Sequence, residues 1–157
     1  MSKPRVLQAG RVYPPSVGGV EQVMQLLSEQ LSDVCDTEVL VANSRNQTVS
    51  EIYNGIHVVR AANMKTVWRM PIALPYFKLF KEMAQDKDIV QLHYPYPIGE
   101  AAYLISGYRG KLFVWWHGEI VRQRLVLPLY RPLVKAVLDR ADGIMVASEQ
   151  QIESSQF

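Results

Sequence analysis

The sequence contains one cysteine, no long apolar run and little net charge, and each of these shortages argues against a class of protein. Cys35 has no second cysteine to pair with, which fits a reducing compartment. No run approaches the ~18 apolar residues of a membrane-spanning helix, and residues 1–10 lack the apolar stretch of a secretory signal. A net charge of +2 gives no reason to expect a nucleic-acid partner. We therefore expect a cytoplasmic protein and, at this length, one domain.

The sequence does contain a regular alternation of short apolar runs and helical patterns. Most runs are rich in Val or Ile and bounded by turn residues, as the buried strands of a parallel sheet are. The expected strands cover residues 6–9, 38–42, 56–60, 88–92, 112–116 and 143–147. The expected helices cover residues 20–31, a segment opening at Pro71, residues 98–107, a segment behind Pro128 and a last one beginning at Ser148. The alternation predicts an α/β fold, a doubly wound, Rossmann-like, mostly parallel sheet with helices on both faces. The polar segment 43–55 is expected to be a surface loop.

Three polar clusters follow strands of this predicted sheet. The first strand leads into a glycine loop, the fourth ends in "HYPYP" and the fifth ends in "HGE". In doubly wound sheets, ligands bind outside the carboxyl ends of the strands, where the strand order reverses. Since the first, fourth and fifth strands lie side by side in the usual order, we expect the three clusters to share one crevice.

The glycine loop is a candidate anion site. Glycine lets backbone N–H groups approach a ligand closely, and the helix that follows directs its positive end there. Gly18, Gly19 and Val20 could therefore bind a phosphate or a sugar oxygen; the alternative is a turn that only joins strand to helix. The spacing is neither G-x-G-x-x-G nor a Walker P-loop. The second strand ends in "ANSR" without an acid for a ribose, which disfavours a nicotinamide dehydrogenase, although Arg45 near a 2′-phosphate stays open.

His117 follows the apolar run "LFVWW", where a buried strand reaches the surface. A neutral imidazole there could bind a sugar hydroxyl or carry a proton; the alternative is a hydrogen bond to a neighbouring carbonyl. His93, Tyr94 and Tyr96 could line an acceptor groove, because tyrosine offers a flat apolar face and a polar tip. The alternative is a loop stiffened by proline, with half-buried tyrosines. Two histidines do not suffice for a metal site, so no metal is expected.

Basic residues gather near the fourth expected helix. Arg131 and Lys135 lie one turn apart, with Arg122 and Arg124 just upstream. A solvated face is the default interpretation. The alternative is an anionic membrane surface, because a basic helix would be useful beside a lipid-linked acceptor. Glu119 and Arg122 are further acceptor-side candidates.

Four segments together resemble the N-terminal domain of the GT-B glycosyltransferases, specifically the large retaining family 4, also called the group 1 transferases. They are "YPPSVGGVEQVMQLLSEQL", "DIVQLHYPYP", "FVWWHGE" and "LDRADGIMVASE". They span nearly the whole chain in the expected order. The Gly-Gly-Val-Glu loop and the downstream His-Gly are fairly specific in combination and weak when taken singly.

This resemblance implies two facing Rossmann domains with the active site between them. Residues 1–157 would be the acceptor-side N-terminal domain, and the C-terminal nucleotide-sugar-binding domain would be absent from this chain. In the family, backbone at the glycine loop approaches the donor diphosphate, which carries over to Gly18 and Gly19. The histidine after the fifth strand lies beside the transferred sugar, which carries over to His117. No metal or other cofactor is expected, since backbone amides and basic side chains of the second domain stabilise the leaving diphosphate.

The implied function is transfer of a sugar, with retention of configuration, from a nucleotide-sugar to a glycan or lipid-linked acceptor. The setting would be the cytoplasm or the inner membrane surface, and the fragment alone would be inactive. A stand-alone Rossmann-like binding or regulatory domain without transferase activity is the main alternative. A nucleotide-sugar epimerase or other Rossmann oxidoreductase is disfavoured, because the dinucleotide fingerprint and a Tyr-x-x-x-Lys motif are both missing.

Overall fold

The computed structural model describes residues 2–118 and 127–148, and within these ranges the chain forms nine strands and four helices. The strands are β1 (Arg5–Ala9), β2 (Asp36–Ala42), β3 (Val49–Tyr53), β4 (Ile56–Ala61), β5 (Lys65–Val67), β6 (Met70–Ile72), β7 (Ile89–Tyr94), β8 (Lys111–Trp116) and β9 (Gly143–Val146). The helices are α1 (Gly19–Leu31), α2 (Pro75–Ala84), α3 (Pro97–Ser106) and α4 (Leu127–Leu138). None of these helices is long and apolar enough to cross a membrane.

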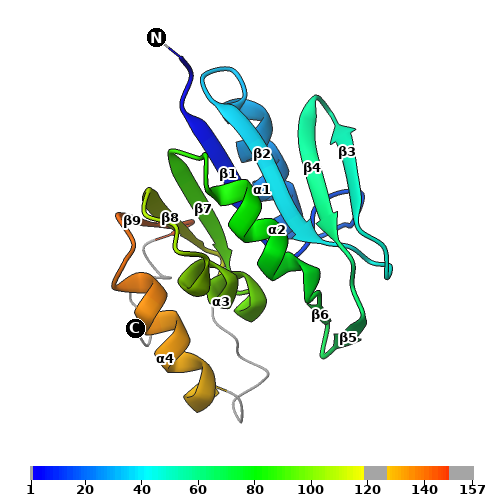
Figure 1. Ribbon diagram of the computed structural model, residues 1–157, viewed down its shortest axis with the longest axis vertical. Helices are drawn as coiled ribbons and strands as arrows, with labels where there is room; N and C mark the ends of the chain where they lie inside the picture. The colour runs from blue at the N-terminus through cyan, green and yellow to red at the C-terminus, as the bar shows by residue number, and fades with distance from the viewer. Residues whose placement is uncertain (1, 119–126, 149–157) are drawn as a thin grey trace.

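Seven of the strands form one sheet in the order β3-β4-β2-β1-β7-β8-β9. All neighbours are parallel except β3, which runs antiparallel to β4. Helix α1 covers one face, while α2, α3 and α4 cover the other (Figure 1). This arrangement confirms the predicted doubly wound sheet. The chain places β2 on one side of β1 and β7 on the other, so the strand order reverses between β1 and β7.

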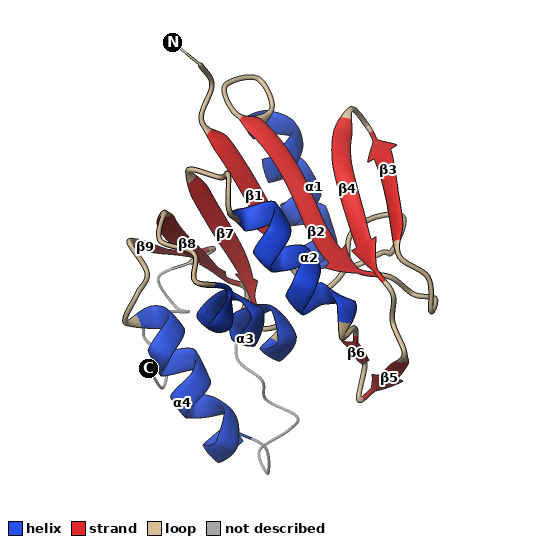
Figure 2. Cartoon of the chain, in the orientation of Figure 1, coloured by secondary structure: helices blue, strands red, loops and turns tan. Residues whose placement is uncertain are grey.

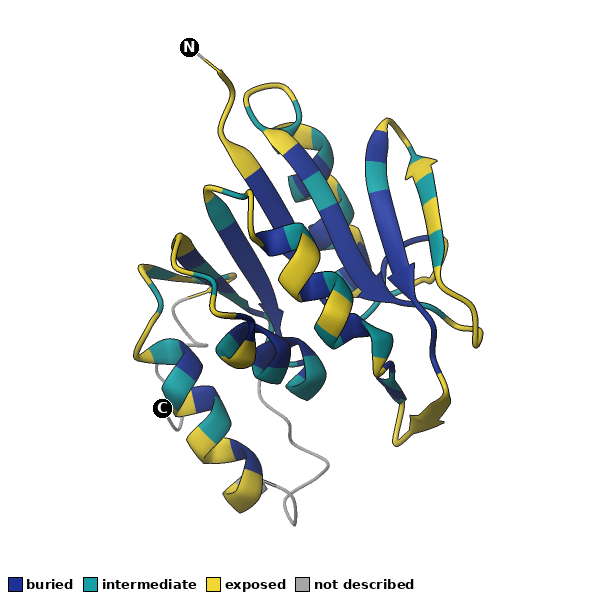
Figure 3. Cartoon of the chain, in the orientation of Figure 1, coloured by how far each residue is buried: buried dark blue, intermediate teal, exposed yellow. Residues whose placement is uncertain are grey.

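The central strands bury both of their faces. In β2, Leu40 and Ala42 join the core on the α2 side, whereas Val39 and Val41 pack with Met24 of α1. This division follows from the pleat, because successive side chains of a strand point to opposite faces. Figure 3 shows β1, β2 and β7 as the buried middle of the molecule. The switch point between β1 and β7 therefore lies in the buried middle of the fold.

The buried face of helix α1 is more polar than we expected from the sequence. Of the apolar residues of α1 only Met24 is fully buried, and Glu21 and Ser28 are buried beside it. Ser28 donates its hydroxyl to the carbonyl of Met24 at 2.7 Å, which satisfies the buried group within the helix. Glu21 faces Arg11, at 3.8 Å between the nearest charged atoms. The helix thus places a carboxylate directly behind the glycine loop.

The connection between β2 and α2 differs from the prediction. Segment 43–55 contains strand β3, which turns into β4 through Asn54 and Gly55, both with positive φ. Pro71 does not open a helix. It lies in β6 of a small β5–β6 hairpin that stands apart from the main sheet (Figure 2), and Pro75 opens α2 instead. Apart from its first residue, the helix expected from Ser148 lies outside the described residues.

Candidate active site

A chain of polar side chains crosses the switch point between β1 and β7. Gln8 and His93 are fully buried, and His117 follows β8 directly. Oε1 of Gln8 lies 2.7 Å from Nε2 of His93, and Nδ1 of His93 lies 2.9 Å from Nε2 of His117. Gln8 also donates from its Nε2 to Oε1 of Gln91 at 2.9 Å. Gly118 then has a φ of 146°, which favours glycine, so the chain can leave the strand immediately after His117.

Burial keeps both imidazoles neutral. Burial, assisted by the neighbouring His117, lowers the pKa of His93 to about 3. Burial also lowers the pKa of His117 to about 4, and the positive charge of Arg11 acts in the same direction. Neither ring therefore carries a charge near pH 7, and a neutral imidazole donates through one nitrogen and accepts through the other. The pair can share a hydrogen bond without bringing two cations together.

The hydrogen-bond chain determines which nitrogen of each ring carries the proton. Gln8 donates through its amide nitrogen to Gln91, so its oxygen faces His93 and must accept. Nε2 of His93 therefore donates, and its Nδ1 is the acceptor. It follows that His117 donates from Nε2 and carries its lone pair on Nδ1. A group that binds Nδ1 of neutral His117 must supply the proton of the hydrogen bond.

The first half of the loop between β1 and α1 is fixed by contacts within the protein. Tyr13 is fully buried and packs edge-on against Tyr53 of β3 at 5.9 Å between ring centroids. Arg60 of β4 donates to the carbonyl oxygens of Tyr13 and Pro14, and its Nε pairs with Glu51 at 2.6 Å. The buried guanidinium thus fixes the loop backbone at two carbonyl oxygens and is itself held in place by Glu51 of β3. These contacts within the protein give a reason for the length of the loop in addition to any ligand that it binds.

The two glycines at the end of the loop have different surroundings. A Cβ on Gly18 would lie 2.2 Å from Oε2 of the buried Glu21, so a side chain there would displace the carboxylate. A Cβ on Gly19 would meet nothing within 4 Å. Packing therefore explains Gly18 but not Gly19. Val20 is half-buried and occupies the first turn of α1.

Arg11 connects the glycine loop to the histidine pair. Its guanidinium lies 3.8 Å from Glu21, and its charge acts on the pKa of His117. Gly10 gives a second connection, since a Cβ there would lie 3.0 Å from Sδ of Met24 and 3.3 Å from Cβ of His93. The start of α1, the end of β1 and the two histidines are therefore close neighbours, as the shared crevice requires.

Tyr94 and Tyr96 lie in the core. Tyr94 stacks on Trp116 at 3.9 Å between ring centroids, and both rings are buried. Tyr96 is also buried and donates its hydroxyl to the carbonyl of Pro71 at 3.3 Å. Neither ring is exposed to an acceptor in this conformation, so their acceptor-side role finds no support in their placement. β7 continues through Tyr94, and Tyr96 lies at the start of α3, so both rings pack inward rather than lining a loop.

The remaining predicted residues contribute less. Glu119 and Arg122 lie outside the described residues. On α4, Arg131 and Lys135 are exposed, and Lys135 pairs with Asp139 at 2.7 Å. Within residues 2–118 and 127–148, no three His, Cys, Asp or Glu side chains gather as a metal would need, and the expectation that no metal takes part stays a prediction.

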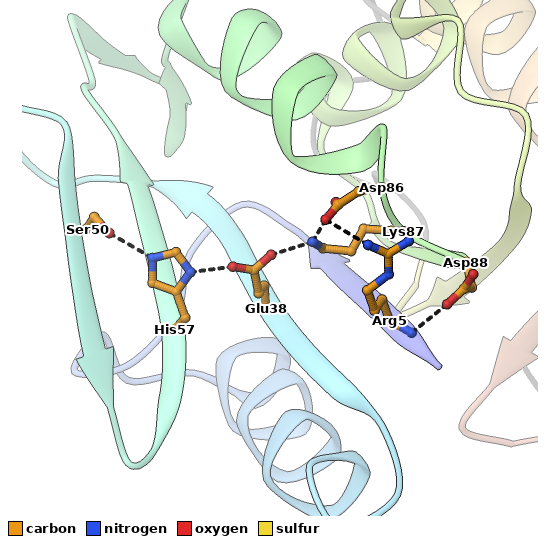
Figure 4. Close-up of polar contacts among 7 residues, drawn as sticks. All are labelled: Arg5, Glu38, Ser50, His57, Asp86, Lys87 and Asp88. Atoms are coloured by element: carbon orange, nitrogen blue, oxygen red, sulfur yellow. Dashed lines mark hydrogen bonds and ion pairs between the residues drawn. The ribbon is translucent and has the colours of Figure 1, made fainter. Parts of the chain in front are cut away.

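A second polar cluster lies at the opposite, amino edge of the sheet (Figure 4). Ser50 lies 2.8 Å from Nε2 of His57, whose Nδ1 contacts Glu38, and Lys87 lies 2.6 Å from the other oxygen of Glu38. The order resembles a Ser-His-acid triad. However, Lys87 already neutralises the carboxylate, and ligands of this fold bind at the other edge. The cluster instead fastens the edge strand β3 and the start of β7 to the sheet.

Several residues of the site were missed from the sequence. Gln8 and Gln91 stand at buried positions of otherwise apolar strands, and this is the signal that could have found them, because buried polar groups need partners. Arg60 is likewise a polar residue at a buried position of the mostly apolar strand β4, so the same signal applies to it. Nothing in the sequence alone indicated that Arg11 and Glu21 would face each other across the start of α1.

Comparison with known proteins identifies the family. The family described as Glycosyltransferase Family 4 matches residues 17–154, which is most of the chain. The chain belongs to glycosyltransferase family 4. It is 34% identical over 154 residues to D-rhamnosyltransferase WbpZ of Pseudomonas aeruginosa, covering 96% of this chain and 40% of that protein. It is 29% identical over 158 residues to O-antigen chain mannosyltransferase C of Escherichia coli, covering 97% and 42%.

Solved structures of glycosyltransferases share the fold. Sucrose-phosphate synthase of Thermosynechococcus elongatus matches with a TM-score of 0.64 at 12% identity, covering 96% of this chain and 44% of that one. The UDP-forming α,α-trehalose-phosphate synthase of Burkholderia xenovorans matches with a TM-score of 0.58 at 14% identity, covering 97% and 42%. The resemblance to an N-terminal family 4 domain of the GT-B fold is thereby confirmed. The chain spans about two fifths of the length of the curated relatives that it matches.

Proposed function

We propose that the chain is the acceptor-side half of a transferase that moves a hexose or deoxyhexose from a nucleotide-sugar to a growing glycan or lipid-linked acceptor. The observation that carries this proposal is the neutral His93–His117 pair at the switch point, in a chain that belongs to a glycosyltransferase family. The relatives named as rhamnosyltransferase and O-antigen mannosyltransferase favour this class of sugar and a polysaccharide product.

His117 would bind the transferring sugar. Its Nδ1 is the lone-pair nitrogen, so a sugar hydroxyl would donate to it, and the burial of the ring would strengthen that hydrogen bond. His93 and Gln8 do not need to touch the sugar, since they hold the proton arrangement of His117 from behind. A neutral His117 would orient the donor sugar by hydrogen bonding, while other groups would stabilise the charge of the leaving diphosphate.

The glycine loop would meet the donor phosphates. Gly18, Gly19 and Val20 open α1, whose N-terminus favours an anion, and the open space above Gly19 would let a diphosphate approach the backbone. The second domain would supply the nucleotide site and the basic groups for the leaving diphosphate, with no metal or other cofactor. Retention of configuration and a location at the cytoplasmic face of the membrane are parts of the same proposal.

The direct test is His117→Ala in a full-length transferase that contains this domain. Losing one hydrogen bond in a closed site should lower turnover by roughly 10²–10³-fold. Nucleotide-sugar affinity should change little, because the nucleotide is bound mainly by the other domain. His57→Ala is the matched control, since His57 lies at the amino edge and should leave turnover unchanged. Unchanged turnover of His117→Ala at saturating substrates would show that His117 does not act on the transferred sugar.

The 157-residue chain provides a second test, which separates a divided active site from a self-contained one. Transfer needs both substrates oriented within bonding distance, together with charge stabilisation of the leaving group. The chain by itself should therefore form no product with labelled nucleotide-sugars and glycan or lipid acceptors. Steady product formation by the chain would mean that the second domain is dispensable and that the divided site is wrong.

A further inference from the structure

The tip of the β5–β6 hairpin contains residues that its backbone does not favour. Val67 pairs with Met70, so Trp68 and Arg69 form a two-residue turn, with φ of 47° and 64°. Two-residue turns with both φ positive normally contain Asn-Gly. The β3–β4 turn of this same chain follows that rule, with Asn54 and Gly55 at 48° and 81°.

Bulky residues in this turn are costly to the fold. A left-handed backbone at a residue with a side chain costs roughly 1–2 kcal/mol. Trp68 and Arg69 both carry this strain, although an Asn-Gly turn would avoid most of it. Strain at a defined position is a reason to look for a function that uses the side chains.

The hairpin tip is both apolar and basic. Trp68 is 70% exposed and Met64 59%, and Val67 is exposed beside them. Residues 43–48 and 62–77 contain three basic residues and no Asp or Glu. The three are Arg45, Lys65 and Arg69, all exposed. The loop of Arg45 touches the base of the hairpin, because the carbonyl of Arg45 accepts from the backbone N–H of Asn63 at 2.9 Å.

The base of the hairpin is held firmly against the site region. Tyr96, which follows β7 and its His93, donates to the carbonyl of Pro71 in β6. Asn63 donates to Thr66 at 2.9 Å and accepts from the backbone N–H of Lys65 at 3.1 Å. In Figure 2 the hairpin projects beyond the carboxyl end of β4, the strand end from which the chain continues to α2. The fold therefore presents an apolar and basic tip at the carboxyl edge of the sheet, with its base fixed by hydrogen bonds.

We propose that this tip, formed by Met64, Lys65, Val67, Trp68 and Arg69, docks on an anionic lipid surface. Tryptophan prefers the headgroup level of a bilayer, and basic residues are attracted to anionic lipids. A hydrophilic polyanion would use the cations but would gain nothing from Met64 and Val67. The inference adds a surface to the proposed transferase, on which it would meet a lipid-linked acceptor, and its test needs no sugar transfer. It also moves the predicted membrane contact from α4 to the hairpin.

The test compares the chain with the double variant Trp68→Asn and Arg69→Gly. This variant restores the preferred turn, so its melting temperature should equal or exceed that of the wild type. The probes are vesicles of phosphatidylglycerol mixed with phosphatidylcholine, and co-sedimentation measures binding. The wild type should bind, and the variant should bind at least about tenfold more weakly, because one cation and the main apolar side chain are gone. Arg131→Gln with Lys135→Gln on α4 is the matched control and should bind like the wild type.

Tryptophan fluorescence gives an independent measurement of insertion. The chain has three tryptophans, and Trp116 is buried while Trp115 is half-buried. Anionic vesicles should shift the wild-type emission to the blue, brominated lipid should quench it, and the double variant should show neither effect.

Several outcomes would overturn the proposal. These are no wild-type binding to anionic vesicles, equal binding of the double variant, loss of binding in the α4 control, or equal binding to pure phosphatidylcholine. Wild-type self-association that the double variant abolishes, measured by sedimentation velocity, would assign the tip to a second copy of the chain. Each of these results is independent of whether His117 acts in transfer, so the two proposals fail separately.

Discussion

Nδ1 of His93 accepts a hydrogen bond from Nε2 of His117 at 2.9 Å, although 24 residues separate the two in the chain. Gln8 accepts from the other nitrogen of His93, so the donors run in one direction, from His117 through His93 to Gln8. The fully buried His93 of β7 thereby controls which atom the half-buried His117 can offer to a ligand.

The first prediction concerns this control. In the 157-residue chain, long-range nitrogen–proton NMR should show His117 with its proton on Nε2 near pH 7. His93→Asn places an amide near the position of Nδ1 and should preserve that state. His93→Gln places its amide near Nε2, keeps the contact with Gln8, and should leave His117 as a mixture of tautomers. A proton on Nδ1 in the wild type, or no difference between the two variants, would contradict the relay.

The second prediction concerns stability in acid. Burial lowers the pKa of His93 to about 3 in the folded chain, against 6.5 for an ordinary histidine. Above pH 6.5 the residue is neutral in both the folded and the unfolded chain, so it takes nothing from the free energy of unfolding there. As the pH falls below 6.5, the unfolded chain binds a proton that the folded chain does not. This one residue should remove about 2 kcal/mol of the free energy of unfolding by pH ~5. Urea titrations of the wild type and His93→Gln should show a smaller acid loss in the variant.

The third prediction concerns Glu100 of α3, which titrates in the opposite sense. Burial raises the pKa of Glu100 to about 7, against the hydrogen bond from the backbone N–H of Tyr96 that lowers it. The folded chain therefore holds a proton that the unfolded chain loses above pH 4.5, and stability declines from there towards pH 7. Glu100→Gln should remove this decline and gain about 3 kcal/mol on the wild type between pH ~4.5 and ~8. A parallel pH dependence of both proteins would show that Glu100 is already ionised.

The fourth prediction separates the two glycines of the loop. Gly18→Ala should lower the free energy of unfolding by about 1–3 kcal/mol, because its Cβ displaces the buried Glu21. Glu21→Ala in the same chain should recover part of that loss. Gly19→Ala should leave stability within about 0.5 kcal/mol, since its Cβ enters open space. Thermal unfolding measures all three variants, and equal losses for Gly18→Ala and Gly19→Ala would contradict the packing difference.

The sequence predicted the parallel sheet well, because strands that are buried on both faces consist of short, continuous apolar runs. It predicted the edge strand β3 poorly, since that strand alternates between half-buried and exposed residues and reads as a polar segment. The Asn54–Gly55 pair was the available hairpin signal. Pro71 was assigned to a helix because proline suits both a helix start and a short edge strand, and only the pairing with β5 separates them.

The sequence predicted where the candidate site lies better than it predicted the contacts of the residues within it. The topology rule located His93 and His117 at neighbouring strand ends, and the structure brings them together. The direction of Tyr94 depended on where β7 ends and that of Tyr96 on where α3 begins, and local sequence determines neither boundary. The anchoring of Tyr13 and Pro14 by Arg60 joins residues more than 40 positions apart, so no local pattern could reveal it.

Strands β1 and β7 each have a hydrogen-bonded neighbour on both sides, and His93 belongs to β7, which lies between β1 and β8. Shifting His93 would mean breaking two backbone ladders at once, an opening whose free energy approaches that of unfolding the whole domain. Strands β1 and β7 should therefore exchange their amide hydrogens slowly and keep their shape when a ligand binds or leaves. Any closing motion around a bound ligand would have to come from other parts of the protein, moving towards strands that stay still.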